Sequence, residues 1–421
     1  MRQTPGRMRI AALVRSNRFT MAGAILFAII IPVLFHPYCT AHYAWARITQ
    51  ANEATIYGST FALLGAHMGL RKVGILPRVD DRTLILPTFL LSYAVIVFFM
   101  THTLGIFGRY HLWTSFAIGI AWYYLLTIAR ARLNFPRLAF VGQMALDEEL
   151  LSERIEWVSL DKPKLPYDVL AIVFDSEQKL LPIWGGFFSR AVLRNVPLYD
   201  LGHFRESVTG RVRLRSRPEL VFGHLMPSQP YLRIKRIIDT LTVVPAIVLA
   251  MPVIAVAALL IRLESPGPAI YRQQRIGYQG RRFTCYKLRS MRSGIVGLAY
   301  TEENDQRVTR IGRFIRKCRV DELPQLFNIL KGEMSWIGPR PESVTLGKAY
   351  QREIPFYAYR HTVRPGITGW AAVHQGNVAL TDGATLKLEY DFYYLKYFSI
   401  WLDFLIVLMT IRTVLTGFGS R

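Results

Sequence analysis

The sequence predicts a membrane protein of mixed α + α/β class: a four-helix transmembrane bundle, a Rossmann-like α/β module, and an α/β catalytic domain. Three observations support this prediction. Hydrophobic residues make up 51% of the 421 residues, a high share for a soluble protein. The first third contains four apolar stretches, each near the roughly 17–25 residues that a spanning helix needs. Patterns typical of buried strands begin only after residue 137.

The predicted bundle occupies residues 19–130, with apolar stretches at 19–35, 56–70, 84–100 and 112–129. The second stretch is the least apolar, because it contains His67 and several glycines. Basic residues gather before the first stretch, between the second and third, and after the fourth, whereas the other two connections carry only Arg47 and Arg109. Since basic loops stay in the cytoplasm, residues 1–18 and the end of the bundle are both predicted there.

Residues 137–226 predict a small α/β module with parallel strands at 138–142, 168–175 and 197–201. The glycine-rich dinucleotide fingerprint is missing, since only Gly142 follows the first strand. We therefore interpret the module as a degenerate Rossmann-like domain with a structural or regulatory role.

Residues 230–421 form the third predicted domain, which begins with an apolar segment at 237–261. Pro245 and Pro252 interrupt this segment, and both of its flanks are basic. These features predict a bent, re-entrant helix that enters the membrane and returns, with an ordinary fifth span as the alternative. Residues 398–418 predict an interfacial helix, with a sixth span as the alternative, and the aromatic residues at 390–397 are typical of an interfacial belt.

The formal net charge of +23 indicates either a nucleic-acid partner or an anionic membrane with phosphorylated substrates. The apolar stretches favour the second, and no nucleic-acid motif is present, so we expect no nucleic-acid partner. Cys39, Cys285 and Cys318 have the spacing of neither a zinc site nor a disulfide framework.

Two adjacent carboxylates, Asp321 and Glu322, follow a segment rich in arginine. An acidic pair that binds a metal ion and is framed by arginines suits phosphate chemistry. The arginines Arg307, Arg310, Arg313 and Arg316 recur every three residues, which predicts a stripe on one face of a helix.

Further candidate phosphate contacts are basic residues outside that stripe. Arg340 stands between two prolines on a stiff loop, and Lys287 and Arg289 alternate on a predicted strand at 283–291, so that they would face one side. A surface strand face is the alternative for the last two.

From Lys235 onward the sequence resembles the bacterial sugar transferases called monotopic phosphoglycosyl transferases. The resemblance rests on seven short motifs in the expected order: Lys235-Arg236-Ile237-Ile238-Asp239, Ser265-Pro266-Gly267-Pro268, Arg272-Gln273-Gln274-Arg275-Ile276-Gly277, Tyr286-Lys287-Leu288-Arg289-Ser290-Met291, the Asp321-Glu322 segment, Gly338-Pro339-Arg340-Pro341 and Arg364-Pro365-Gly366-Ile367-Thr368-Gly369-Trp370. The first half is similar to the long subgroup of that family, which carries four extra spans and an α/β module. One departure is Met251-Pro252, where small family members often have Ser-Pro.

The resemblance implies an enzyme of the bacterial inner membrane with its catalytic domain on the cytoplasmic face. It would transfer a sugar 1-phosphate from a UDP-sugar to polyprenyl (undecaprenyl) phosphate and release UMP, initiating exopolysaccharide, capsule or O-antigen synthesis. It further implies a covalent phosphosugar intermediate on Asp321, Mg²⁺ bound with the help of Glu322, and phosphate binding by Arg316. Two alternatives remain open: a non-covalent ternary mechanism, and a membrane scaffold or regulator with an inactive transferase domain. A homodimer is also left open.

Overall fold

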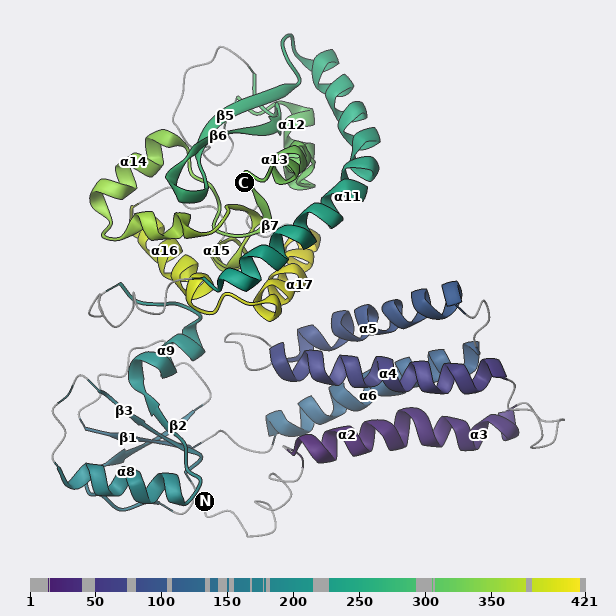
Figure 1. The fold of residues 1–421 in the computed structure, drawn as a ribbon, viewed down its shortest axis with the longest axis vertical. Helices are drawn as coiled ribbons and strands as arrows, with labels where there is room; N and C mark the ends of the chain where they lie inside the picture. Colours follow the sequence, from purple (N-terminus) through teal and green to yellow (C-terminus); the bar gives the residue numbers. More distant parts are fainter. Residues whose placement is uncertain are drawn as a thin grey trace. The chain divides into compact units, whose positions relative to one another are not determined.

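The computed structural model describes residues 16–39, 50–73, 81–103, 108–132, 137–142, 155–166, 169–176, 182–214, 227–292, 307–375 and 381–416, with the single residues 14, 150, 178 and 305. The predicted cytoplasmic segment 1–18 lies mostly outside these residues. The chain divides into two compact units, Met1–Thr209 and Gly210–Arg421. A helical bundle and a small α/β module make up the first unit, and Figure 1 shows both.

The bundle consists of α2 (Asn17–Ile25), the π-helical segment η1 (Leu26–Ile30), α3 (Ile31–Cys39), α4 (Gln50–Val73), α5 (Asp81–Thr103) and α6 (Arg109–Arg132). Three of its segments, Asn17–Phe35, Leu84–Thr103 and Arg109–Arg130, are long and apolar enough to cross a membrane. The second predicted span, α4, is a helix but does not reach that level of apolarity. Ala62, Leu63 and Ala66 of α4 are fully buried in the bundle core, so α4 packs against its neighbours.

The α/β module contains β1 (Arg137–Val141), β2 (Glu156–Leu160), β3 (Ala171–Phe174), β4 (Leu198–Asp200), α8 (Ile183–Leu193) and α9 (Leu201–Thr209). Its strands form one parallel sheet in the order β2-β1-β3-β4. The three predicted strands are confirmed. The sequence did not predict β2, because Glu156 and Ser159 interrupt its apolar run. Residues 215–226 of the predicted module lie outside the described residues.

The second unit is built around two two-stranded sheets. β5 (Ile270–Ile276) and β6 (Arg282–Leu288) pair antiparallel across η2 (Tyr278–Gly280), and β7 (Ser335–Ile337) pairs in parallel with β8 (Gly366–Thr368). The helical elements of this unit are α11 (Gln229–Glu264), α12 (Arg310–Lys317), η3 (Val320–Gln325), α13 (Leu326–Lys331), α14 (Val344–Glu353), η4 (Tyr357–Thr362), α15 (Trp370–Gln375), α16 (Thr381–Lys396) and α17 (Ile400–Thr416).

The second unit also includes residues before position 230, where the third predicted domain begins. The Gly210 carbonyl accepts a hydrogen bond from Trp370 Nε1 at 2.8 Å, and the Val212 amide donates to the Glu389 carbonyl at 3.1 Å.

Helix α11 covers the apolar segment at 237–261 in 36 residues, with Pro245 and Pro252 inside it, and it bends along its course (Figure 1). One face is buried in the core that it shares with β6, α12 and α13. That face consists of Val243, Ala250, Ile254, Ala257 and Ile261. The opposite face is apolar and largely exposed, as in Leu241, Val248, Leu249, Leu259 and Leu263.

Both ends of α11 contact other helices of the second unit. Near its beginning, Lys235 Nζ donates to Asp403 Oδ2 of α17 at 2.5 Å, and Arg236 donates to the Ile329 carbonyl of α13 at 2.7 Å. At its end, the Glu264 carboxylate accepts from the Arg310 amide of α12 at 2.8 Å. The two ends of this long apolar helix therefore dock on the same unit.

The prediction of an interfacial aromatic belt at 390–397 is wrong for most of these positions. Tyr390, Phe392, Tyr393 and Tyr394 are at most 4% exposed, because they fill the core between α16 and its neighbours. The Tyr394 hydroxyl donates to Asp403 Oδ1 at 2.8 Å. Helix α17 falls within the predicted interfacial segment, with Leu402, Leu405 and Ile406 buried on one side.

Candidate active site

The acidic pair lies on η3, a short 3₁₀ helix between α12 and α13. Arg319, directly before η3, has φ 58°, a left-handed conformation that is unfavourable for a residue with a side chain. Strained backbone of this kind persists where the surrounding structure holds it, commonly at functional sites. The turn at Arg319 directs the chain into η3, so that Asp321 and Glu322 both lie against β6.

Two cations fix the position of Glu322. Its Oε1 atom accepts from Arg340 Nη2 at 2.6 Å and from Lys287 Nζ at 3.2 Å, and Arg319 lies 3.9 Å from Oε2. Burial alone would raise the pKa of Glu322, but Arg340 and Lys287 outweigh burial and hold that pKa well below its ordinary range. Glu322 is therefore a carboxylate whose orientation is set by Arg340 and Lys287.

Asp321 is buried, but it has no hydrogen bond or ion pair with any residue that the structure describes. Burial and the adjacent negative charge of Glu322 raise its pKa. Its oxygens are thus available to an incoming group, in contrast to Oε1 of Glu322.

The pair fits magnesium only if the substrate completes the coordination. No group of three or more His, Cys, Asp or Glu side chains with metal-binding geometry occurs among the described residues. Mg²⁺ is commonly bound by one or two carboxylates together with substrate phosphates and water. Asp321 and Oε2 of Glu322 match that donor set.

The loop that carries Arg340 is held at its backbone. Arg360 Nη2 donates to the Arg340 carbonyl at 2.9 Å, and the Arg275 guanidinium of β5 donates to the Pro341 carbonyl. Gly338 packs so closely on the residues that lead into β8 that an added Cβ would lie 2.3 Å from the Arg364 carbonyl oxygen. The loop therefore has little freedom, and the Arg340 side chain extends from a fixed position.

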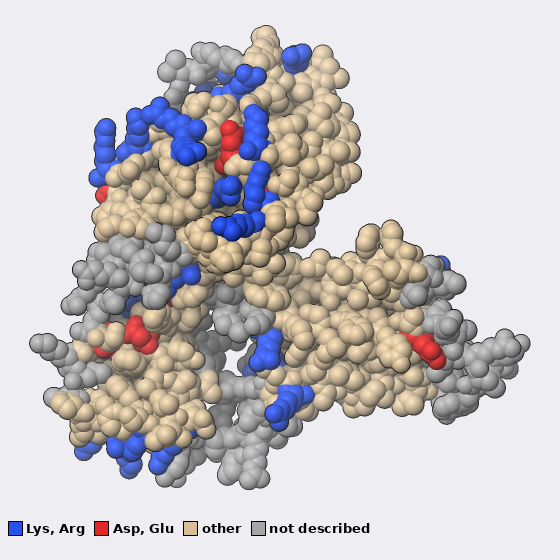
Figure 2. Space-filling model, viewed as in Figure 1, with Lys and Arg blue, Asp and Glu red and all other residues tan. Residues whose placement is uncertain are grey.

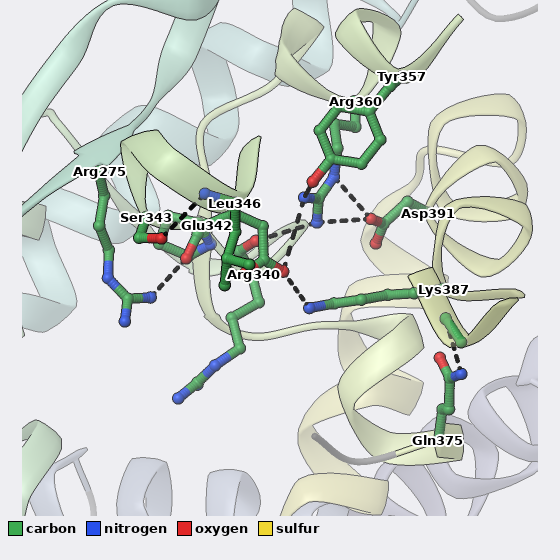
Figure 3. A network of polar contacts seen from close by, with 12 residues as sticks. Arg275, Arg340, Glu342, Ser343, Leu346, Tyr357, Arg360, Gln375, Lys387 and Asp391 are labelled. Carbon is green, nitrogen blue, oxygen red and sulfur yellow. Dashed lines mark hydrogen bonds and ion pairs between the residues drawn. The ribbon is translucent and has the colours of Figure 1, made fainter. Parts of the chain in front are cut away.

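Figure 3 shows the buried polar network behind this loop. Arg360 bonds Asp391 Oδ2 at 2.8 Å and the Tyr357 hydroxyl at 2.6 Å, while Lys387 pairs with Glu342. The Arg360 and Asp391 side chains are each only 2% exposed. The Arg340 side chain extends away from the network, which holds the backbone of the loop.

The network also sets the protonation state of Glu342. Burial would raise its pKa, but Lys387 and Arg360 lower it to about 2. The carboxylate is therefore charged at any physiological pH.

The arginine stripe is shorter than predicted. Helix α12 begins at Arg310, and Arg307 lies before it, paired with Asp305 at 2.6 Å. Arg313 is exposed. Arg316 is half-buried. Burial lowers its pKa, although the negative charges of Asp321 and Asp305 act in the opposite direction. Of the arginines on α12, Arg316 is thus the one with clear coupling to Asp321.

The structure brings Lys287, Arg316 and Arg340 together around the acidic pair, but it places Arg289 elsewhere. β6 ends at Leu288, and the Arg289 guanidinium donates to the carbonyls of Pro266 at 2.6 Å and Ser265 at 2.7 Å. Arg289 therefore secures the end of α11 and does not face the same side as Lys287.

Asn328 of α13 is a residue that sequence reasoning missed. Its Oδ1 accepts from the Tyr286 amide at 3.2 Å, and its Nδ2 donates to the Thr284 carbonyl at 2.7 Å and to Glu333 at 2.7 Å. It thereby joins β6 to the helix that follows η3 and keeps Lys287 opposite Glu322. Its place in Leu326-Phe327-Asn328-Ile329, a polar residue in an apolar run, was the available signal.

The charges around the site are visible on the molecular surface. Figure 2 shows acidic side chains on one face of the second unit with Lys and Arg on several sides. Such a surface concentrates anions at the acidic pair.

Comparison with known proteins gives consistent results. Residues 230–417 match the family described as bacterial sugar transferase. The chain is similar to the UDP-N-acetylgalactosamine-undecaprenyl-phosphate N-acetylgalactosaminephosphotransferase of Aeromonas hydrophila, with 40% identity over 383 residues that cover 90% of each chain. It is also similar to the UDP-glucose:undecaprenyl-phosphate glucose-1-phosphate transferase of Caulobacter vibrioides, with 40% identity over 201 residues, 46% of this chain and 75% of that protein.

Proposed function

Because this chain belongs to the bacterial sugar transferase family, we propose that it transfers a sugar 1-phosphate from a UDP-sugar to undecaprenyl phosphate. The products are UMP and a polyprenyl diphosphate sugar, which would initiate an exopolysaccharide, capsule or O-antigen. UDP-N-acetylgalactosamine is the first donor to test, because the Aeromonas hydrophila relative is named for it.

One observation carries the mechanism: two adjacent carboxylates differ sharply in their contacts. Glu322 is bound by Arg340 and Lys287, whereas Asp321 has no such partner among the described residues. A carboxylate that is free of partners but surrounded by cations suits a nucleophile that must attack the phosphorus of an anionic phosphate group.

The proposed reaction has two displacements at the same phosphorus. First, an Asp321 oxygen attacks the sugar-bearing phosphorus of the donor, and the bond from that phosphorus to the UMP oxygen breaks, so that UMP leaves with the electron pair. Second, a phosphate oxygen of undecaprenyl phosphate attacks, and the bond to Asp321 breaks, which restores the carboxylate. Arg316, whose charge interacts with that of Asp321, would bind the transferred phosphate.

A divalent ion such as Mg²⁺ is proposed to bind at Asp321 and Oε2 of Glu322 together with the donor diphosphate. When bound, it would neutralise charge on the phosphates. Arg340 and Lys287 hold Oε1 of Glu322, so they orient the remaining oxygen toward such an ion.

A re-entrant course of α11 is part of the proposal. Support comes from the docking of both its ends on one unit, through Lys235 at the start and Glu264 at the end, while its outward face is apolar. A straight crossing would put those ends, and the helices that they contact, on opposite sides of the roughly 30 Å hydrocarbon layer. The catalytic unit would then lie on the cytoplasmic face of the bacterial inner membrane.

The test is UMP release by the purified full-length protein with Mg²⁺, undecaprenyl phosphate and UDP-sugars. Asp321→Asn should lower the rate by about 10³-fold or more, because an amide is a poor nucleophile. When a donor labelled in its sugar phosphate is added without acceptor, the label should remain on the peptide that contains Asp321.

The alternatives give different results. UMP release without a trapped label would favour a non-covalent ternary mechanism. An inactive wild-type protein, with an unchanged cellular phenotype for Asp321→Asn, would favour a scaffold.

A further inference from the structure

A polar pocket opens among the helices of the bundle, in the first unit and outside the candidate active site. It has a volume of about 410 Å³. Residues of α2, α4, α5 and α6 line it: Asn17, Thr20, His67, Leu70, Arg71, Leu84, Ile85, Tyr123, Thr127 and Arg130. These positions are the start of α2 and α5 and the end of α4 and α6, so the pocket lies at one end of the bundle.

The polar lining is organised by hydrogen bonds between helices. Arg130 Nη2 donates to Thr20 Oγ1 at 2.5 Å, and His67 Nδ1 lies 2.7 Å from the Tyr123 hydroxyl. Arg71 is exposed and has no hydrogen bond or ion pair with any residue that the structure describes. Polar and ionisable groups within apolar helices are costly and commonly mark a binding site.

The charge of the pocket indicates that its ligand is an anion. Arg71 and Arg130 both line it, and none of its described lining residues is acidic. The Arg71 guanidinium can bind a phosphate through paired N–H donors. Arg130 adds positive charge beside it, with its Nε and Nη2 atoms donating to the Val14 carbonyl and to Thr20 Oγ1.

The position of the pocket indicates that this phosphate belongs to a lipid. Figure 2 shows Lys and Arg atoms at the end of the bundle where α2 begins. The opposite end has Arg109 at the start of α6. By the positive-inside tendency, the pocket end faces the cytoplasm, where the anionic lipids of the inner leaflet lie and where basic pockets between helices bind headgroups.

We propose that this pocket binds the phosphate of a lipid headgroup at the cytoplasmic end of the bundle, with Arg71 and Arg130 as its charged contacts. The acyl or polyprenyl chain would extend between the helices into the membrane. Anionic phospholipid and polyprenyl phosphate share this chemistry. The proposal does not depend on the transferase activity proposed above, because the pocket belongs to a different unit.

The experiment measures lipid binding to the full-length protein in nanodiscs of neutral lipid. One arm adds phosphatidylglycerol, a second adds polyprenyl phosphate, and a third adds diacylglycerol, which lacks phosphate; native mass spectrometry after mild extraction reports the lipid retained. Arg71→Ala should weaken binding of a phosphate lipid about fivefold, the effect of one basic side chain near an anionic lipid. Arg71→Lys should recover most of the loss.

Arg109→Ala is the matched control, since it removes an exposed arginine at the other end of α6. Retention in the first or second arm, lowered by Arg71→Ala but not by Arg109→Ala, supports the proposal and identifies the lipid. Equal losses in both variants, equal retention of diacylglycerol, or no retention in any arm would overturn it.

Discussion

The buried pair of Arg360 and Asp391 offers a direct test of how the Arg340 loop is supported. Arg360→Met would leave Asp391 charged and without its partner in a site where both side chains are 2% exposed. It would also remove the bonds to the Tyr357 hydroxyl at 2.6 Å and the Arg340 carbonyl at 2.9 Å. Breaking one side of a buried ion pair costs about 3–5 kcal/mol.

That cost should be visible in thermal unfolding of the detergent-solubilised full-length protein. For a unit of this size, about 1 kcal/mol shifts the Tm by roughly 2–4 °C, so Arg360→Met should lower the Tm by about 6 °C or more. The double variant Arg360→Met with Asp391→Leu should recover much of the loss, since an apolar pair of similar volume leaves no unpaired charge at these two positions. Arg352→Met, on the exposed side of α14, is the control and should stay within about 2 °C.

The reasoning would be refuted by either of two results. A Tm unchanged in Arg360→Met would show that Asp391 finds other partners. A double variant that loses the sum of the two single losses would show that the pair does not act as a unit.

Three further predictions follow from the same contacts. Arg340→Lys should lower kcat/KM for UMP release by about 10- to 100-fold, because Glu322 loses a hydrogen bond from a charged donor. A rate within twofold of wild type would contradict the geometry at Glu322. Glu342 has a pKa of about 2, below its ordinary 4.5, so its stabilisation, at most about 3 kcal/mol, is present above pH 4.5 and lost as pH falls toward 2. Melting curves of Glu342→Gln should therefore fall less steeply with acid than those of wild type, and parallel curves would count against the assignment. Thiol reagents should modify the exposed Cys318 well before the buried Cys285, as peptide mass spectrometry would report; the reverse order would be inconsistent with the packing of β6.

Much of the candidate site was predictable because its members are charged residues in short, distinctive motifs. Asp321, Glu322, Lys287, Arg316 and Arg340 were all predicted from the sequence, and the structure brings them together. What spacing could not give was the difference in contacts between the two carboxylates. That difference depends on which side chains approach Glu322 from β6 and the Arg340 loop.

The residues that sequence reasoning missed act through burial. Asp391 lies in a helix rich in tyrosine, where the sequence is equally typical of an interfacial belt, and only the tertiary structure places it against Arg360. Arg289 shows the converse error, because alternation along a strand applies only while the strand continues, and β6 ends one residue before it.

For the fold as well, local patterns could be predicted and tertiary contacts could not. Long apolar helices and continuous apolar strands were predicted because their patterns are local. Strand β2 was not, because it is stabilised by its pairing with β1 and not by its own composition. The contacts of the two ends of α11 with α12, α13 and α17 likewise depend on the tertiary structure, and no local pattern contains them.

The outward surface of α11 has a consequence for kinetics. An enzyme anchored by an apolar helix stays at the membrane and does not diffuse into the cytosol. For the proposed reaction, it would meet its acceptor by diffusion within the bilayer and bind its donor from solution. Turnover should then scale with the mole fraction of acceptor in the bilayer, and adding more vesicles at a fixed total amount of acceptor should slow it down.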